Sequence, residues 1–268
     1  MENLMDIAIQ AAHVGGEVVK AHYGHQTFVE KKLNFDYVTD VDMLSERSIR
    51  EYLAKKCPDF GFMGEETVYN NYASEDAFLD DLSDDSWTWI VDPLDGTMNF
   101  IRQIPQFCVS VALAQGRELV AGAVLDVSQG AMFSAEKGRG AYLNGKPIHI
   151  SPVEDLREAI IGAAFPAAEV NKRGIVMDAL NRMTMDVGSI RIYNSAALMM
   201  CYIACGRLDV GFECGIHIWD MGAGTVIVRE AGGEVLHCDG SPFTIYSREQ
   251  FSGNPAILKA VRPYLQVN

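Results

Sequence analysis

The sequence predicts an α+β protein whose two halves differ in how helices and strands alternate. Residues 1–150 carry two helical stretches and then a run of short apolar segments, typical of helices packed on a largely antiparallel sheet. Residues 151–268 alternate strands with helices, which is typical of an α/β arrangement. No internal repeat or flexible linker separates the halves, so we expect them to share a continuous interface.

Apolar spacing and turn residues define the elements of the first half in order. A helix is predicted at 4–23 and a second around 44–53, with a polar loop at 30–42 between them. An acidic, irregular excursion at 70–86 follows. Asn144-Gly145 predicts a hairpin between the last extended pieces. The predicted strands are 107–115, 119–127, 131–138 and 141–148.

The second half alternates between the two element types. Strands are predicted at 159–165, 208–213 and 234–237, with a short strand end near Arg191. Helices are predicted at 170–185, in the apolar run that ends at Gly206, at 219–233 and at 254–265.

The composition excludes several classes of function. The chain has 268 residues, of which 49% are hydrophobic and 22% charged, as is ordinary for a globular protein with a sizeable core. Its 36 acidic and 22 basic residues give a formal net charge of −14, which repels nucleic acid and anionic membranes but attracts metal ions. No run is long and apolar enough to span a membrane, and the N-terminus does not have a signal-peptide pattern. We expect neither nucleic acid nor a membrane as partner.

The six cysteines indicate a cytoplasmic protein. They are scattered, lack CxxC pairs and lie mostly in apolar surroundings. This pattern predicts reduced core thiols and argues against a zinc site.

The stretch WIVDPLDGTMNF at 89–100 places two aspartates directly after an apolar run. The run predicts a buried strand that Pro93 ends, and a charge there is unfavourable unless something pairs with it. Either Asp92 and Asp95 only cap a proline-glycine turn with local hydrogen bonds, or they bind a cation. The stretch alone leaves both interpretations open.

Acidic residues lie at the ends of predicted elements in three further places. Asp40 and Asp42 precede the second helix and Asp220 begins a later one, and these positions suit ordinary helix capping. Glu65 and Glu66 follow an apolar run, where adjacent glutamates are commonly solvated. None of these places is specific alone.

Taken together, the four acidic places indicate a magnesium site. Hard divalent cations prefer a few carboxylates, with water and substrate phosphate completing their coordination. Two ions about 4 Å apart can hold the attacking water and the leaving oxygen of a phosphoryl transfer. The turn can direct Asp92 and Asp95 toward different ions, with the carbonyl of Leu94 as a further ligand. It leaves the amides of Gly96 and Thr97 free to receive phosphate oxygens.

Other catalytic motifs are absent from the sequence. The acidic segment DAFLDDLSDDSW lacks the glycine and closing glutamate of an EF-hand. There is no GxxxxGK[ST], no GxGxxG that opens a helix and no GxSxG nucleophile elbow. Among the histidines, only His217 neighbours a candidate site residue, and we interpret it as structural.

These residues resemble the signatures of the inositol monophosphatase family of Mg²⁺-dependent, lithium-sensitive phosphatases. The resemblance rests on GEE at 64–66, WIVDPLDGTMNF at 89–100 and WDMGAGTVIVREAGG at 219–233, in order through nearly the whole chain. It implies a five-layered αβαβα sandwich of the sugar-phosphatase type, commonly a homodimer. Residues 1–150 would then carry most metal ligands, and 151–268 would carry substrate contacts and one metal ligand.

The resemblance also implies a ligand set for two or three Mg²⁺ ions. The first ion would be bound by Glu65, Asp92 and the carbonyl of Leu94. The second would be bound by Asp92, Asp95 and Asp220, and a third, weaker ion would lie near Glu65.

The catalytic residues implied by the resemblance are Glu65, Thr97 and Asp42. Thr97 would hydrogen-bond the nucleophilic water and be oriented by Asp42. The phosphate would rest on the amides of Gly96 and Thr97. Supporting residues around the site would be Glu66 and Lys31.

The substrate implied by the resemblance is a small phosphorylated polyol. Ala196, Glu213 and Asp220 would contact it, whereas Asn194 departs from the glycine that the family often has there. We expect in-line attack of water on myo-inositol monophosphate without a phosphoenzyme. Relatives of this fold act on 3′-phosphoadenosine 5′-phosphate, fructose 1,6-bisphosphate, NADP or histidinol phosphate, and these remain alternatives. The rival from another class is a metal-binding regulatory protein that has lost catalysis.

Overall fold

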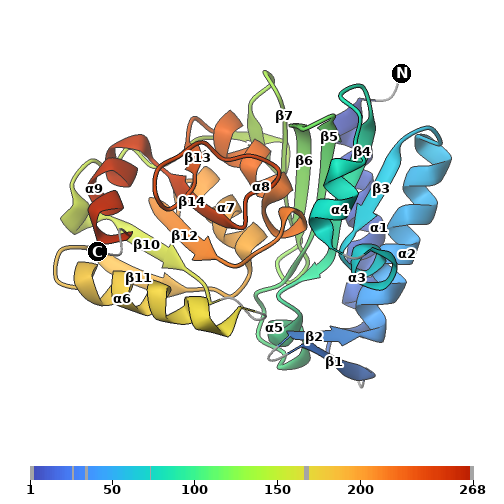
Figure 1. Cartoon of the computed structure of the whole chain (residues 1–268), viewed down its shortest axis with the longest axis horizontal. Coiled ribbons are helices and arrows are strands. Elements are labelled where there is room, and N and C mark those ends of the chain that lie inside the picture. Colours follow the sequence, from blue (N-terminus) through green and yellow to red (C-terminus); the bar gives the residue numbers. More distant parts are fainter. Residues whose placement is uncertain (1–2, 26, 34–35, 73, 166–168, 266–268) are drawn as a thin grey trace.

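The computed structural model describes residues 3–25, 27–33, 36–72, 74–165 and 169–265 of the chain. Two large sheets lie between three layers of helices, which confirms the five-layered αβαβα sandwich (Figure 1). Clusters of buried apolar side chains fill the spaces between the layers.

The first outer layer consists of α1 (Leu4–His22) and α2 (Asp40–Lys56), as predicted. Apolar side chains of α1 recur at helical spacing and pack on β5 and β6 of the first sheet. Helix α2 begins before its first apolar position because Thr39 and Asp42 form a capping box that satisfies free backbone amides.

The first sheet has seven strands in the order β3-β4-β5-β6-β7-β8-β9. Every neighbouring pair is antiparallel except β3 and β4, so the prediction of a largely antiparallel sheet is confirmed. The central strands are almost continuously apolar because helices cover both of their faces. The strands are β3 (Gly61–Gly64), β4 (Trp87–Asp95), β5 (Cys108–Gln115), β6 (Glu118–Asp126), β7 (Ala131–Glu136), β8 (Ala141–Leu143) and β9 (Lys146–Ile148).

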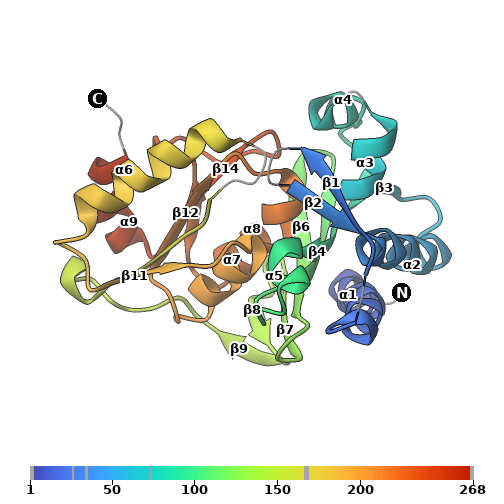
Figure 2. The same cartoon turned by 90° about the horizontal axis from the view of Figure 1, so that it is seen from below.

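Helices α7 (Ala196–Ala204) and α8 (Ile218–Glu230) form the central layer between the two sheets (Figures 1 and 2). Every residue of α7 is buried, because one side faces α8 and another faces β12 and β14 of the second sheet. Helix α8 packs mainly on β5 and β6. The second half of the chain therefore completes the hydrophobic core of the first.

The second sheet has five strands in the order β11-β10-β12-β14-β13. Strand β10 is parallel to both of its neighbours, whereas β14 is antiparallel to β12 and β13. Helices α6 (Arg173–Met183) and α9 (Pro255–Leu265) cover its outer face. The strands are β10 (Ile160–Ala163), β11 (Ser189–Ile192), β12 (Val210–Cys214), β13 (Glu234–Leu236) and β14 (Glu249–Gly253).

Two predictions of irregular structure in the first half were wrong. Strands β1 (Val29–Leu33) and β2 (Asp36–Thr39) form a hairpin where a polar loop was expected, although 34–35 of that loop lie outside the described residues. Helix α4 (Glu75–Asp80) forms within the acidic excursion, because Ser74 caps it and its apolar side is buried. The other short helices are α3 (Glu65–Asn71), α5 (Thr97–Ile101), η1 (Leu156–Glu158) and η2 (Val170–Lys172).

The strand before the two aspartates does not end where the sequence indicated. Strand β4 continues through Pro93 to Asp95, and its register against β5 shifts between Asp92 and Asp95. Proline cannot donate to the ladder, so the strand bulges there instead of stopping. Strand β14 was not predicted, because its sequence EQFSG lacks a β-branched pattern.

The two sheets divide along the chain close to the expected boundary. Strand β9 of the first sheet ends at Ile148, and β10 of the second begins at Ile160. The division into parts at 1–150 and 151–268 stays a prediction, since α7 and α8 join both cores. Among the described helices, none has the length and apolar character needed to cross a membrane.

Candidate active site

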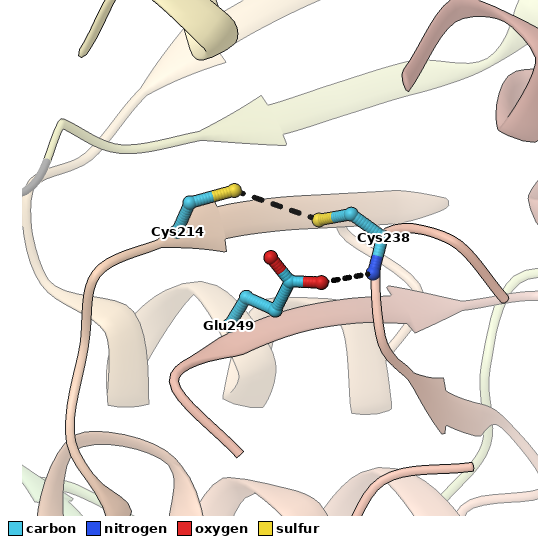
Figure 3. Close-up of side chains that lie close together, drawn as sticks. All are labelled: Cys214, Cys238 and Glu249. Atoms are coloured by element: carbon cyan, nitrogen blue, oxygen red, sulfur yellow. Dashed lines mark hydrogen bonds between the residues drawn. The ribbon is translucent and has the colours of Figure 1, made fainter. Parts of the chain in front are cut away.

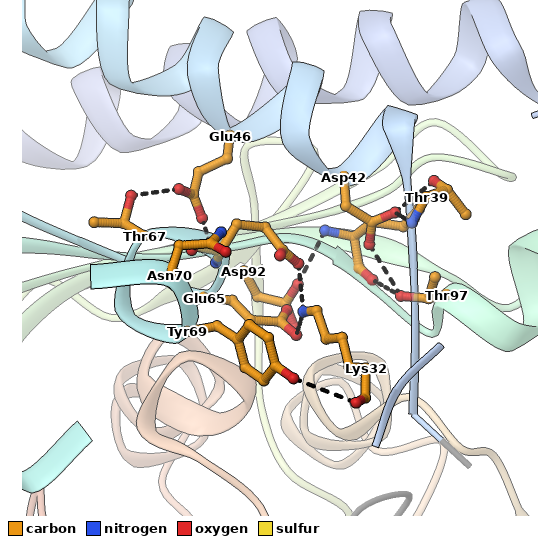
Figure 4. Close-up of polar contacts among 12 residues, drawn as sticks. Lys32, Thr39, Asp42, Glu46, Glu65, Thr67, Tyr69, Asn70, Asp92 and Thr97 are labelled. Carbon is orange, nitrogen blue, oxygen red and sulfur yellow. Dashed lines mark hydrogen bonds and ion pairs between the residues drawn. The ribbon is translucent and has the colours of Figure 1, made fainter. Parts of the chain in front are cut away.

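One cavity of roughly 270 Å³ lies where the end of β4 meets the central helices. Its walls come from α3, β4, α5, α7, β12 and α8, so residues from both halves meet there. The predicted site residues in its lining are Glu65, Asp92, Leu94, Asp95, Gly96, Thr97, Ala196, Glu213 and Asp220. Asp42 lies directly behind this lining, in contact with Thr97 (Figure 4), and Glu66 is the buried neighbour of Glu65.

The bulge at the end of β4 shapes one wall of this cavity. The amide of Leu94 donates to Asp92 Oδ1 at 2.9 Å, and Ser45 Oγ donates to the carbonyl of Pro93 at 3.0 Å. Gly96 has φ +90°, and a Cβ there would stand 2.8 Å from the carbonyl oxygen of Gln106. Only glycine suits this position, so the turn that precedes α5 depends on it.

Thr97 and Asp42 are in contact, as the resemblance implied. Thr97 Oγ1 lies 3.1 Å from Asp42 Oδ1 and 2.9 Å from the carbonyl oxygen of Leu94, so its hydroxyl has two acceptors. Asp42 Oδ2 accepts hydrogen bonds from the amide and hydroxyl of Thr39. Burial raises the pKa of Asp42 to about 7. The same carboxylate thus caps α2 and holds Thr97, so the two interpretations of Asp42 are compatible.

Asp95, the last residue of β4, lies against the first turn of α7, and its two carboxylate oxygens have different surroundings. Oδ2 accepts from Ser195 Oγ at 2.7 Å, from the amide of Ala197 at 2.8 Å and from Cys108 Sγ at 3.5 Å. Among the described residues no donor is recorded for Oδ1. Burial is the main cause that raises the pKa of Asp95. Ser195 was missed by sequence reasoning, because the partners are about a hundred residues apart.

Asp220 lies in the first turn of α8 and lines the cavity. Its Oδ2 accepts from the amide of His217 at 2.6 Å, so the same residue also caps the helix. Burial, with the nearby carboxylates of Asp95 and Glu65, raises the pKa of Asp220 to about 8. His217 was interpreted as structural, yet it also lines the cavity. Its Nδ1 lies 2.7 Å from Glu75 Oε2 of α4, and this contact fixes the ring.

Glu65 and Glu66 begin α3 and share one lysine. Lys32 Nζ lies 2.8 Å from Glu65 Oε1 (Figure 4) and 2.5 Å from Glu66 Oε1. Burial opposes the charge of Lys32, but attraction to the two glutamates outweighs it and raises its pKa. Lys32 was not predicted from the sequence, whereas Lys31, which is exposed, stays a prediction as a residue near the phosphate. A register irregularity in β1 lies between Lys31 and Leu33, at the position of Lys32.

A buried glutamate of α2 holds the start of α3 in place. Glu46 Oε2 accepts from the amide of Glu66 at 2.8 Å, and Glu46 Oε1 accepts from Thr67 Oγ1 at 2.6 Å. Glu46 was not predicted as a site residue, because its partners Glu66 and Thr67 lie about twenty residues further along the chain.

The second half of the chain supplies the opposite wall. Glu213 of β12 is buried, and its Oε2 has no hydrogen-bond partner among the described residues. Burial is the main cause that raises its pKa well above the ordinary value. Asn194 also lines the cavity, in a left-handed conformation with φ 51°, and its side chain accepts from the amide of Phe165 at 3.2 Å.

Comparison with known proteins decides the family. A profile of the inositol monophosphatase family matches residues 1–266. The chain belongs to the inositol monophosphatase family. It is 35% identical over 270 residues to inositol monophosphatase 1 of Solanum lycopersicum, covering 100% of this chain and 96% of that protein. It is 34% identical to Nus factor SuhB of Xylella fastidiosa, covering 88% of this chain and 81% of that protein.

Solved structures agree with this assignment. The crystal structure of extragenic suppressor protein suhB from Bartonella henselae superposes with a TM-score of 0.88 at 33% identity, covering 98% of both chains. The fold is that of inositol monophosphatase, and membership of this phosphatase family makes the chain an enzyme.

The residues of the cavity fit the metal dependence of the inositol monophosphatase family, generally on Mg²⁺. Repulsion from Glu65, Asp95 and Asp220 adds to burial in raising the pKa of Asp92, so these carboxylates lie close enough to repel one another. Such a set is all oxygen, which suits a hard cation. Lys32 contacts Glu65 and Glu66 of this group, and Arg173 also lines the cavity.

We expect Mg²⁺ to stabilise the protein more strongly at pH 8.5 than at pH 6. Asp220 and Glu66 have pKa values raised to about 8, mainly by burial, so folding without metal favours their protonated forms. The free energy of unfolding that these protonated groups contribute is full at low pH. It decreases as the pH rises above the ordinary carboxyl pKa, and it is lost once the pH has passed 8. Bound Mg²⁺ requires the ionised forms and opposes the loss.

Thermal unfolding in EDTA and in millimolar Mg²⁺ at both pH values measures this effect. In EDTA the Tm should fall between pH 6 and pH 8.5, and Asp220→Asn should reduce the fall. Equal Mg²⁺-induced shifts at the two pH values would show that protons and metal do not compete for these carboxylates.

Proposed function

We propose that the protein hydrolyses the phosphate monoester of a small polyol, with myo-inositol monophosphate as the first candidate. The observation that carries this proposal is the unpartnered Oε2 of Glu213 in the same cavity as the acidic cluster. A buried acceptor without a donor is unfavourable, and a hydroxyl of the substrate would satisfy it. Whether ionised or neutral, Glu213 offers no positive charge to a second phosphate, which favours a polyol over a bisphosphate.

Two or three Mg²⁺ ions are proposed as cofactors. Glu65, Asp92 and the carbonyl of Leu94 would hold one ion, and Asp92, Asp95 and Asp220 would hold another. Bound Mg²⁺ would supply charge neutralisation for the phosphate and activation of water. Asp95 supports this role, because its Oδ2 is occupied by Ser195 and α7 while Oδ1 is left for another partner.

The residues around the proposed Mg²⁺ ions would orient the attacking water and the substrate. The hydroxyl of Thr97, placed between Asp42 and the carbonyl of Leu94, would align the attacking water. The amides of Gly96 and Thr97 would receive phosphate oxygens, and Ala196 would pack against the polyol. The carboxyl of Asp42, held by Thr39, keeps the hydroxyl of Thr97 oriented.

Glu213→Ala is expected to lower kcat/KM on inositol monophosphate about ten- to a hundredfold. The effect on a small aryl phosphate should be slight, because that substrate offers no hydroxyl to Glu213. Asp220→Ala should impair both substrates alike, since it removes a proposed metal ligand. The measurement is kcat/KM of both variants on both substrates.

Glu213→Gln is the matched control, because it keeps the size of the side chain and its capacity to bond a hydroxyl. It should lose less than Glu213→Ala on inositol monophosphate. An equal loss on both substrates for Glu213→Ala, or no loss on either, would remove the support for a polyol substrate.

Further properties of the family are expected of this chain as well. A homodimer, inhibition by lithium and a cytoplasmic location stay predictions. Asn194, which lines the cavity, is expected to influence which polyol phosphate is preferred.

A further inference from the structure

A second group of ligand-type side chains lies at the edge of the second sheet. Cys214 ends β12 and faces Glu249, its cross-strand partner at the start of β14. Cys238 follows β13, and its amide donates to Glu249 Oε1 at 2.9 Å. Strands β12, β13 and β14 thus bring together three residues that are far apart in the sequence (Figure 3).

The distances within this group suit one metal ion. The two sulfur atoms are 3.6 Å apart, and the two sulfurs and a carboxylate oxygen all lie within 4.8 Å of one another. Two thiolates bound to one tetrahedral Zn²⁺ at about 2.3 Å stand roughly 3.8 Å apart. A disulfide requires about 2.05 Å, so bridging would need the sulfurs to approach by a further ~1.5 Å.

The group lies largely inside the protein, with one side toward solvent. Cys214 and the Cys238 thiol are buried or nearly so, whereas Glu249 is partly exposed, so an ion would reach the group past Glu249. His237 places its Nδ1 3.6 Å from Glu249 Oε1 and its Nε2 2.8 Å from Ser247 Oγ. Ligating carboxylates are commonly held by a further hydrogen bond, and the amide of Cys238 donates one to Glu249.

We propose that Cys214, Cys238 and Glu249 bind one Zn²⁺ ion, with water as the fourth ligand. On binding, each thiol loses its proton to solvent and both sulfurs coordinate as thiolates, so two protons are released for each ion. The contact with Cys214 Sγ, together with burial, raises the pKa of Cys238, so this thiol is protonated before the ion arrives. The sequence argued against a zinc site because it has no CxxC motif. The two cysteines come together only through the pairing of strands, which the sequence pattern does not show.

This site differs in chemistry from the acidic cavity. Soft thiolates select Zn²⁺, whereas carboxylates and carbonyls suit Mg²⁺. None of the three residues belongs to the described lining of the cavity. Cys214 nevertheless follows Glu213 directly on β12, and successive side chains of a strand point to opposite faces. Zn²⁺ would therefore cross-link β12, which carries Glu213, to its neighbours from outside the cavity.

Titration of the metal-free protein with Co²⁺ in excess Mg²⁺ under reducing, anaerobic conditions tests the proposal. Co²⁺ occupies zinc sites, and bonding to thiolate gives an intense near-ultraviolet charge-transfer band that carboxylate ligands cannot produce. We expect this band to saturate at one Co²⁺ per chain and to disappear when Zn²⁺ is added. The variant Cys238→Ser should abolish it, and Glu249→Gln should weaken Co²⁺ binding by about tenfold or more.

Cys205→Ser is the matched control, because Cys205 is partly exposed but lies outside the group. It should keep the band, and far-ultraviolet circular dichroism should show that all variants are folded. No band in the unaltered protein overturns the proposal. A band that survives in Cys238→Ser overturns it as well, because the thiolate would then lie elsewhere.

Discussion

Asp95→Asn is expected to lower kcat/KM by more than about a hundredfold while the protein stays folded. Loss of a residue that merely supports metal ligands typically causes a ten- to hundredfold loss, and Asp95 is proposed as a direct ligand. The asparagine can turn its carbonyl oxygen toward Ser195 and Ala197, which keeps the hydrogen bonds at the start of α7. Its amide nitrogen then replaces the carboxylate oxygen that would face Mg²⁺.

Mg²⁺-dependent phosphate release measures the loss of activity in Asp95→Asn, and thermal unfolding shows whether the variant stays folded. Asp126→Asn is a suitable control, because Asp126 is equally buried and accepts hydrogen bonds from Ser128 and Gln129. It lies outside the described cavity lining and should lose little activity. Activity of Asp95→Asn within threefold of the unaltered protein would refute a metal role for Asp95.

Thr97→Val is expected to lower kcat by about a hundredfold or more with little change in KM. Positioned groups that align or deprotonate a nucleophile typically contribute 10²–10⁴-fold. Valine has nearly the same shape as threonine, so the start of α5 should be kept while the hydroxyl is lost. The proposed water would then lose the group that Asp42 and the carbonyl of Leu94 hold in place.

Thr97→Ser restores the hydroxyl without the methyl group and should recover most of kcat. Steady-state kinetics of both variants on one substrate, with the Tm of each, separate alignment from packing. Equal losses in the serine and valine variants would indicate that the methyl group, and not the hydroxyl, matters at this position.

Local sequence patterns determined most of the fold and much of the candidate site. Apolar spacing located α1, α2, α7, α8 and α9, because each helix buries a continuous face or its whole surface. The hairpin at Asn144-Gly145 was predictable because few residues tolerate its backbone. Carboxylates at element ends indicated a cation site, because unpaired charge is not tolerated at the end of a buried strand.

Contacts between distant segments were decided only by the tertiary structure. The approach of β1 to α3 brings Lys32 to Glu65 and Glu66. The central position of α7 brings Ser195 to Asp95. The pairing of β12, β13 and β14 gathers two cysteines and a glutamate that no sequence motif connects. Helical and strand periodicity indicates which face of an element is buried. The element against which that face packs depends on strand order and register. Those are set by packing over the whole molecule.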